Sequence, residues 1–292
     1  MSQDKTMENS YILRNPSENE IIDVIDQNGS DFFSTIVDFL DKDEFFKKNP
    51  NSEFSKKNDV SKLFTGINYP FWNSLWGANF TEQEVKEKVS TLISQAKRKN
   101  IPFMWFVGVL SKPHNLGDYL EKAGLIKDES PGMYLNLREL DGLKYQEVLD
   151  QSKIKIERVS NPKEEEHWAD ICSTIFGMDE VKDEVGRIWS FCFKICDAYL
   201  ATHDGKPVGA SMVFYSSGVA GIYNVAVYPE YRNRGIGTAI TMAPLLQAKK
   251  KGYEISVLTA SQLGFNAYSK IGFKECWKYE NYIYIPQPNE EN

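Results

Sequence analysis

A strand that runs into an arginine-rich loop and then a glycine-containing helix start is the feature that most constrains this chain. The strand ends in Val225, Ala226 and Val227, and after a proline turn the loop and helix start comprise Arg232, Asn233, Arg234, Gly235, Ile236, Gly237 and Thr238. The first N–H groups of a helix lack intrahelical partners and carry the positive end of the helix dipole. Glycines let an anion approach the backbone, and the arginines add positive charge. The segment favours phosphate binding, although a plain tight loop also explains its Gly-Ile-Gly element.

Two common phosphate-binding motifs are excluded by missing residues. A nucleotide-triphosphate loop needs Gly-Lys followed by Ser or Thr, and the segment has none. A dinucleotide-binding fold would place a glycine at position 240, where Ile240 stands, and would feed the strand almost directly into the first glycine.

A second element, Tyr268 four residues before Gly272-Phe273, follows at a fixed separation. Together the two elements closely resemble the GNAT superfamily of acyl-CoA-dependent N-acetyltransferases. The family signature is a Val-Ala-Val-type strand, a proline turn and an Arg-x-x-Gly-x-Gly loop that opens a helix, and Arg232, Gly235 and Gly237 occupy its fixed positions. The resemblance covers residues 153–285.

The same stretch predicts an α/β fold with a mixed sheet and helices on both sides. Turn and cap residues give the order β-α-α-β-β-β-α-β-α-β-β, in which Asn161-Pro162 starts a helix and Asp204-Gly205 forms a hairpin turn. Two closing strands are expected after the last helix, reaching about Ile285. This order is the one that the GNAT resemblance implies.

The resemblance also implies a site. Backbone groups of the strand from Val225 through Ala226 to Val227 would pair with the pantetheine arm of acetyl-CoA, and the amides from Asn233 to Thr238 would cradle its pyrophosphate. Tyr268 would protonate the departing thiolate, and the N–H of Val227 would hold the oxyanion. Without the resemblance, Tyr268 also reads as a buried aromatic residue with a satisfied hydroxyl.

Several positions depart from the family pattern. The strand from Gly221 to Asn224 has no carboxylate where some relatives place their base, so the base stays unassigned. Tyr223 and Asn224 either order a water, contact the substrate or are structural. Ser261 and Gly264 stand where relatives often have Asn and Ala. Pro244 lies inside a predicted helix, where it removes a backbone hydrogen bond.

The length of 292 residues suggests two domains. Residues 95–100 resemble residues 247–252, and residues 120–125 resemble residues 268–273, in the same order. We therefore expect two tandem GNAT-like domains: a degenerate one at 1–150 and a catalytic one at 151–292. The first lacks an arginine-glycine loop and has Leu120 at the tyrosine position, so it should not bind acetyl-CoA and would instead wall the acceptor site.

An aromatic cluster in the first half allows two interpretations, a packed core or a lining of the substrate cleft. Its members are Tyr69, Phe71, Trp72, Trp76 and Phe80. The three histidines stand apart in the sequence, and none is assigned a chemical role.

The charge and the distribution of apolar residues limit the kinds of partner and the location expected for this chain. Lys and Arg number 34 against 41 Asp and Glu, giving a net charge of -7, which disfavours nucleic acid as the main partner. The uncharged stretch from Pro207 to Pro229 is broken by glycines and serines, so it predicts two strands rather than a membrane span. The first ten residues do not resemble a signal peptide, which predicts a cytoplasmic location.

The four cysteines are expected to be free thiols. Cys192 and Cys196 are spaced one helical turn apart, which suits a metal, but no further ligand is near in sequence. Core packing is the preferred interpretation, and no metal is expected.

The predicted function is transfer of an acetyl group from acetyl-CoA to a primary amine of a small molecule, peptide or protein, by a monomer or homodimer. The alternative is a GNAT-like protein that holds acyl-CoA without turnover, as a sensor or structural protein.

Overall fold

A computed structural model describes residues 11–287, and contacts divide them into two compact units. Unit 1 comprises 11–31, Gly132–Gly177 and Cys192–Trp277, and unit 2 comprises Phe32–Pro131, Met178–Phe191 and 278–287. Four 3₁₀ helices lie among the longer elements: η1 (Pro70–Trp72), η2 (Leu137–Glu139), η3 (Asp179–Val181) and η4 (Pro229–Tyr231).

Unit 1 contains a mixed sheet with the strand order β5-β10-β9-β8-β7-β6. The strands are β5 (Ile126–Asn136), β6 (Ile154–Arg158), β7 (Asp197–His203), β8 (Lys206–Ser216), β9 (Val219–Val227) and β10 (Ile255–Thr259). All neighbours are antiparallel except β9 and β10, which are parallel. The hairpin turn predicted at Asp204-Gly205 is confirmed, since both residues have positive φ.

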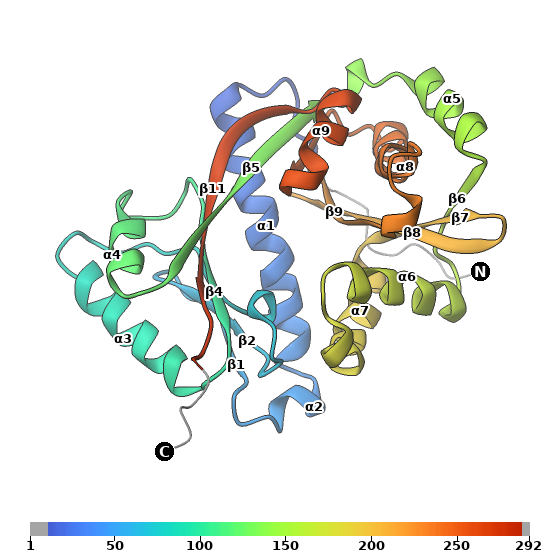
Figure 1. Cartoon of the computed structure of the whole chain (residues 1–292). Helices are drawn as coiled ribbons and strands as arrows, with labels where there is room; N and C mark the ends of the chain where they lie inside the picture. The colour runs from blue at the N-terminus through green and yellow to red at the C-terminus, as the bar shows by residue number, and fades with distance from the viewer. Residues whose placement is uncertain (1–10, 288–292) are drawn as a thin grey trace. The chain divides into compact units, whose positions relative to one another are not determined.

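Helices cover both faces of this sheet, as predicted (Figure 1). They are α5 (Gly142–Ser152), α6 (Pro162–Ile175), α8 (Ile236–Lys250) and α9 (Gln262–Ile271). The side chain of Asn161 caps α6, whose residue Trp168 is buried and donates its indole N–H to the carbonyl of Ser211 at 2.9 Å. On the opposite face α8 packs against β7, β8 and β9 around a continuous apolar core.

Unit 2 repeats part of this plan. Its sheet has the order β1-β2-β3-β4-β11, with β1 (Glu53–Ser55), β2 (Ser61–Phe64), β3 (Asn73–Trp76), β4 (Phe103–Val107) and β11 (Lys274–Tyr284). Only β3 and β4 are parallel. Its core includes α3 (Val85–Arg98) and α4 (Leu116–Lys122), while α2 (Glu44–Lys47) is short. The helices α1 (Glu18–Leu40) and α7 (Lys182–Ile195) contribute residues to both units.

In each unit, one edge strand of the sheet directly follows, in sequence, a helix of the other unit. Strand β5 follows α4, yet its Gly132–Asn136 portion pairs with β10 in unit 1. Strand β11 follows α9, yet its Glu280–Tyr284 portion pairs with β4 in unit 2. The prediction of two closing strands after α9 is therefore wrong. One strand, β11, follows α9, and β5 takes the remaining place beside β10.

The two internal sequence matches adopt the same local structure. Both α4 and α9 are followed within two residues by a glycine with positive φ, and the residue after that glycine donates its N–H back into the last turn: Leu125 to Leu120 and Phe273 to Tyr268, each at 3.1 Å. Asn100 and Gly252 likewise have positive φ at the ends of α3 and α8. The division at residues 150 and 151 stays a prediction about how the two halves arose.

The aromatic cluster of the first half packs within unit 2. Trp72, Trp76 and Phe80 are buried, and Phe71 packs with its ring centroid 4.9 Å from that of Trp72. These contacts favour the packed-core interpretation. The four cysteines are free thiols, as predicted, and Cys172, Cys192 and Cys196 are buried.

Candidate functional site

Strand β9 separates from β10 partway along its length. The two strands pair only at Ala220 with Ser256 and at Gly221 with Val257. On its other side β9 shifts register against β8 between Ala210 and Met212, and Asn224 has a φ of 53° at this bulge. The bulge redirects β9, so its edge from 222 to 227 lies beyond the last pair with β10.

The backbone of Val227 faces this open edge. Successive residues of a strand direct their N–H groups to alternate edges. Tyr228 donates its N–H to Val208 of β8 at 3.1 Å, so the N–H of Val227 and, two residues earlier, that of Val225 are directed away from β8. The carbonyl of Val227 accepts a hydrogen bond from Nε of Arg232 at 3.1 Å, which holds the arginine against the strand end.

The loop after β9 presents a row of unbonded amides. The first intrahelical hydrogen bond of α8 runs from the N–H of Ala239 to the carbonyl of Gly235 at 3.0 Å. Within residues 11–287, none of the N–H groups from Asn233 to Thr238 has a hydrogen-bond partner. Asn233 and Gly235 have φ values of 60° and 79°, which turn the chain so that these amides gather at the helix start.

Positive charge accompanies the amides. Arg232 and Arg234 are exposed, and the guanidinium carbon of Arg234 lies 5.4 Å from the centre of the Tyr231 ring. The ring of His203 lies 5.7 Å from that of Tyr231. A helix dipole, free amides and two arginines at one place favour an anionic group over a neutral or cationic one.

The backbone at Gly237 is open. A Cβ atom built there would meet only Cγ2 of Val227, at 4.0 Å. A glycine at this position is therefore not required by the packing of the described residues, and its lack of a side chain leaves space beside the free amides.

Tyr268 belongs to the same apolar core as Val227 and Ile236. Its position follows from how α9 ends. Gly272 has a φ of 117°, the N–H of Phe273 donates to the carbonyl of Tyr268, and the Phe273 ring packs edge-on against the Tyr268 ring with centroids 6.0 Å apart. This is the hydrogen-bond and apolar contact pattern of a Schellman helix end, which explains the Tyr-x-x-x-Gly-Phe spacing.

The Tyr268 phenol is protonated at neutral pH. Tyr268 is 8% exposed, and burial raises its pKa to about 12. Its hydroxyl makes no hydrogen bond with any residue in the described range 11–287. The proton of this hydroxyl is therefore not committed to another protein group.

Tyr223 and Asn224, left undecided from the sequence, have structural partners. The Tyr223 hydroxyl donates to Oδ1 of Asn28 on α1 at 2.7 Å, and burial raises the pKa of Tyr223. The Asn224 carbonyl accepts the thiol of Cys172 at 3.8 Å. Asn28 lies directly over Gly221, where a side chain would collide with its amide oxygen. Sequence reasoning missed Asn28, because nothing in the pattern of α1 indicates which residue reaches β9.

The run of lysines at 249–251 serves the far end of α8. Lys249 donates to the carbonyls of Arg138 and Leu140 at 3.2 and 3.1 Å, and Lys251 pairs with Asp197 at 2.7 Å. Lys249 and Lys251 therefore bind groups near the C-terminal end of α8.

Unit 2 differs at the corresponding place. After β3, the chain stays joined to the segment after β4, because Lys112 donates to Ala78 at 2.8 Å and accepts from Phe80 at 3.1 Å. The loop before α3 carries Glu82 and Glu84 and no arginine. The strands are closed together and the helix start is acidic, so this place does not suit an anionic ligand.

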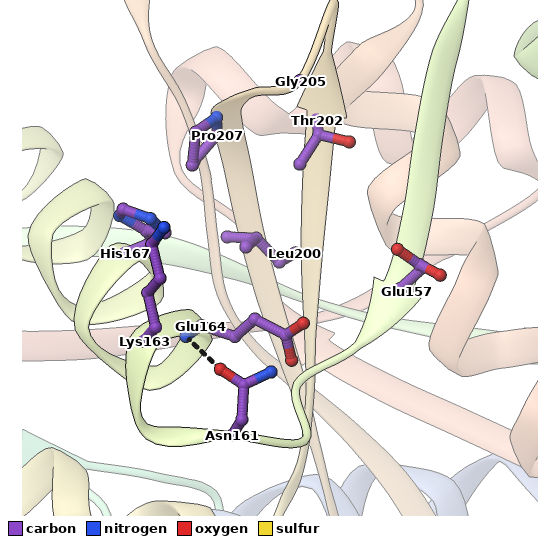
Figure 2. A pocket seen from close by; sticks show the side chains of 9 residues that line it. All are labelled: Glu157, Asn161, Lys163, Glu164, His167, Leu200, Thr202, Gly205 and Pro207. Carbon is purple, nitrogen blue, oxygen red and sulfur yellow. Dashed lines mark hydrogen bonds between the residues drawn. The ribbon is translucent and has the colours of Figure 1, made fainter.

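A separate pocket of about 240 Å³ lies in unit 1 between α6 and the β7–β8 hairpin (Figure 2). Leu200 and Thr202 line it, and they alternate with Tyr199 and Ala201 of the α8-facing core, so the pocket opens on the other face of the sheet. The dashed line in Figure 2 is the Asn161 cap, which accepts the N–H of Glu164 at 3.1 Å. The polar groups that line this pocket therefore include Asn161 and Glu164, which form the N-terminal cap of α6.

Two features are absent from the described residues 11–287. No helix there combines the length and the apolar character that a membrane crossing needs. Nor does this part of the chain bring three or more His, Cys, Asp or Glu side chains together in a metal-binding arrangement.

Comparison with known proteins agrees with this architecture. Residues 194–275 match the family model described as "Acetyltransferase (GNAT) domain". No curated protein sequence matches the chain.

Solved structures that match nearly the whole chain include the following three. A GCN5-related N-acetyltransferase from Kribbella flavida has 14% identity and a TM-score of 0.60, over 91% of this chain and 97% of that chain. One from Sphaerobacter thermophilus has 12% identity and a TM-score of 0.57, over 94% and 95%. A tandem GNAT protein from the clavulanic acid biosynthesis pathway has 10% identity and a TM-score of 0.51, over 90% and 98%. The chain therefore has the GNAT fold, and its residues 194–275 match the GNAT acetyltransferase domain.

Proposed function

We propose that this protein is an N-acetyltransferase that transfers the acetyl group of acetyl-CoA to a primary amine of a small molecule, peptide or protein. The observation that carries the proposal is the row of unbonded amides from Asn233 to Thr238, next to two arginines and to the open edge of β9. An acyl-CoA has a pyrophosphate for the amides and a pantetheine arm with amide groups for a strand edge.

The amides from Asn233 to Thr238 bind the pyrophosphate, and the other predicted residues support this contact or hold the pantetheine arm. The backbone of Val225 and Val227 pairs with the pantetheine arm. Ala226 lies between them with its side chain buried, and the buried side chain of Ile236 anchors the start of α8 in the core. Arg232 fixes the strand end, and Arg234 adds charge near the pyrophosphate. Gly235 provides the turn, and Gly237 leaves room for the anion.

In the reaction, the donor supplies an activated thioester carbonyl, and the neutral amine attacks its carbon. The N–H of Val227 stabilises the charge that develops on the carbonyl oxygen. When the carbon–sulfur bond breaks, the electron pair stays on sulfur, and the Tyr268 hydroxyl gives that thiolate its proton. The nitrogen, which became positively charged on attack, loses one proton to solvent, and the tyrosinate regains one proton from solvent.

Burial raises the pKa of both groups in this proton transfer, the Tyr268 phenol that donates and the thiolate that accepts. A phenol with a pKa of about 12 is a weak acid, but apolar surroundings also raise the pKa of a thiol. A thiolate leaving beside Tyr268 is correspondingly basic.

A second candidate is a sensor that binds acyl-CoA without turnover. It is favoured by the strand from Gly221 to Asn224, which offers no carboxylate as a base and whose Tyr223 hydroxyl is bonded to Asn28. Release of free thiol from acetyl-CoA, measured across small amines, peptides and lysine-rich proteins, separates the two. We expect amine-dependent thiol release. Binding of acetyl-CoA without turnover on any amine would support the sensor.

A further inference from the structure

Gly264 lies one helical turn before Tyr268 on α9, and the tyrosine ring occupies the space that a side chain at 264 would fill. A Cβ atom at Gly264 would lie 2.6 Å from Cε2, 3.0 Å from Cζ and 3.1 Å from the hydroxyl oxygen of Tyr268. Side chains in a helix lean toward its N-terminus and over the residue four positions earlier, so the spacing places the ring over Gly264. The absence of a side chain at 264 lets the ring lie this close to the helix backbone.

The ring is also held from a second direction. Phe273 packs edge-on against it, and the position of Phe273 is fixed by the hydrogen bond from its N–H to the Tyr268 carbonyl at 3.1 Å. The Gly264 N–H is itself tied to Ser261, which caps α9 at 3.2 Å. A side chain at 264 would therefore have to displace the Tyr268 ring, because the backbone on both sides is fastened.

We infer that Gly264 is a positioning residue whose missing side chain sets where the Tyr268 hydroxyl lies. The inference rests on the proposed function, in which this hydroxyl protonates the thiolate. It also gives a reason for the departure from the alanine that relatives often have at this position: in this chain the tyrosine ring sits directly on the helix backbone.

The test is Gly264→Ala, with Gly186→Ala as the matched control. Gly186 is also helical, and a Cβ there would meet nothing within 4 Å. In Gly264→Ala we expect kcat to fall by about 10- to 100-fold, because a shift of about 1 Å in a catalytic group has effects of that order. Donor affinity should stay within about two-fold and Tm should not fall, since alanine is the better helix former. The control should keep kcat, affinity and Tm.

A second readout does not depend on turnover. With 3-fluorotyrosine in place of tyrosine, the ¹⁹F resonance of Tyr268 is assigned by its loss in Tyr268→Phe. We expect it to move in Gly264→Ala and not in Gly186→Ala. In the Tyr268→Phe background, Gly264→Ala should cause no further loss of kcat, because there is no hydroxyl left to misplace.

An unmoved resonance, or a Gly264→Ala variant with the kcat of the wild type beside a slow Tyr268→Phe, would overturn the inference. A fully active Tyr268→Phe variant would instead remove Tyr268 as the acid. The fluorine measurement then still decides whether Gly264 fixes the ring, so the two failures are distinguishable.

Discussion

The candidate site depends on a few residues in unusual backbone conformations. Asn224, Asn233 and Gly235 all have positive φ, a region that glycine and asparagine enter at least cost. The glycine in the loop was recognisable in the sequence because it follows arginine and opens a helix. Asn224 was not, since an asparagine within a strand pattern does not by itself indicate a bulge.

At Gly237 we predict that a leucine separates binding from folding. A Cβ atom at this position would meet only Val227 in the protein, so the free energy of unfolding should be unchanged or slightly higher. It would fill the space beside the free amides, so acetyl-CoA affinity should fall by about 10-fold or more, a loss of about 1.4 kcal/mol. Calorimetric titration and thermal unfolding measure the two effects, with Gly186→Leu as the control. Unchanged affinity would remove Gly237 from the phosphate site.

For Tyr268→Phe we predict a fall in kcat of about 100-fold with little change in donor affinity, as expected for loss of a general acid. The pH dependence of kcat in the wild-type protein should agree with this role. Burial raises the pKa of Tyr268 from 10.0 to about 12. The hydroxyl therefore keeps its proton up to pH 10, and kcat should fall only at higher pH, where the hydroxyl ionises and can no longer act as an acid. A kcat that declines between pH 8 and pH 10 in the wild type but not in Tyr268→Phe would contradict this assignment.

Helix α8 shows how an element accommodates a residue that should break it. Pro244 has no N–H to donate to the carbonyl of Ile240, four residues earlier. The hydroxyl of Ser211, fully buried on β8, donates to that carbonyl at 2.7 Å. The sequence predicted the lost hydrogen bond but not its replacement, because the donor lies 29 residues away on another element.

We predict that Ser211→Ala destabilises the protein by about 1–3 kcal/mol, since it leaves the Ile240 carbonyl buried without a donor. In a Pro244→Ala background the helix regains its own N–H, so the same change should cost less. Urea unfolding of the four proteins forms a double-mutant cycle. Equal costs in both backgrounds would show that the hydroxyl and the proline are independent.

Local signals explain why the elements of unit 1 were predictable and its closing strand was not. Asn161-Pro162, Asp204-Gly205 and the Tyr268-to-Phe273 spacing each act within a few residues, and the structure confirms them. The pairing of β10 depends on Gly132–Asn136, more than a hundred residues earlier, and no local pattern encodes such a contact.

The exchange of β5 and β11 predicts that the halves of the chain do not fold separately. A fragment of residues 151–292 lacks the strand that pairs with all five residues of β10, which leaves an apolar sheet edge unpaired. We expect this fragment to aggregate or to lack a cooperative thermal transition, whereas the full chain unfolds cooperatively. Circular dichroism during heating tests this, with a 125–292 fragment, which restores β5, as the comparison. A cooperative transition in the shorter fragment would contradict the prediction.

At the scale of the molecule, the two units share a sheet plan but differ at the place where the ligand would bind. In unit 1 the parallel strands separate and an arginine loop follows. In unit 2 the corresponding segments are joined by Lys112, and the loop is acidic. We therefore predict one acetyl-CoA site in each chain.

Calorimetric titration of acetyl-CoA into the full chain tests this claim most directly. We predict a stoichiometry of one per chain, with affinity that falls as salt rises because arginines and free amides hold a pyrophosphate. The Gly237→Leu variant should lose that binding, and no second class of sites should remain. Two sites per chain, or a single site that Gly237→Leu leaves intact, would contradict the account.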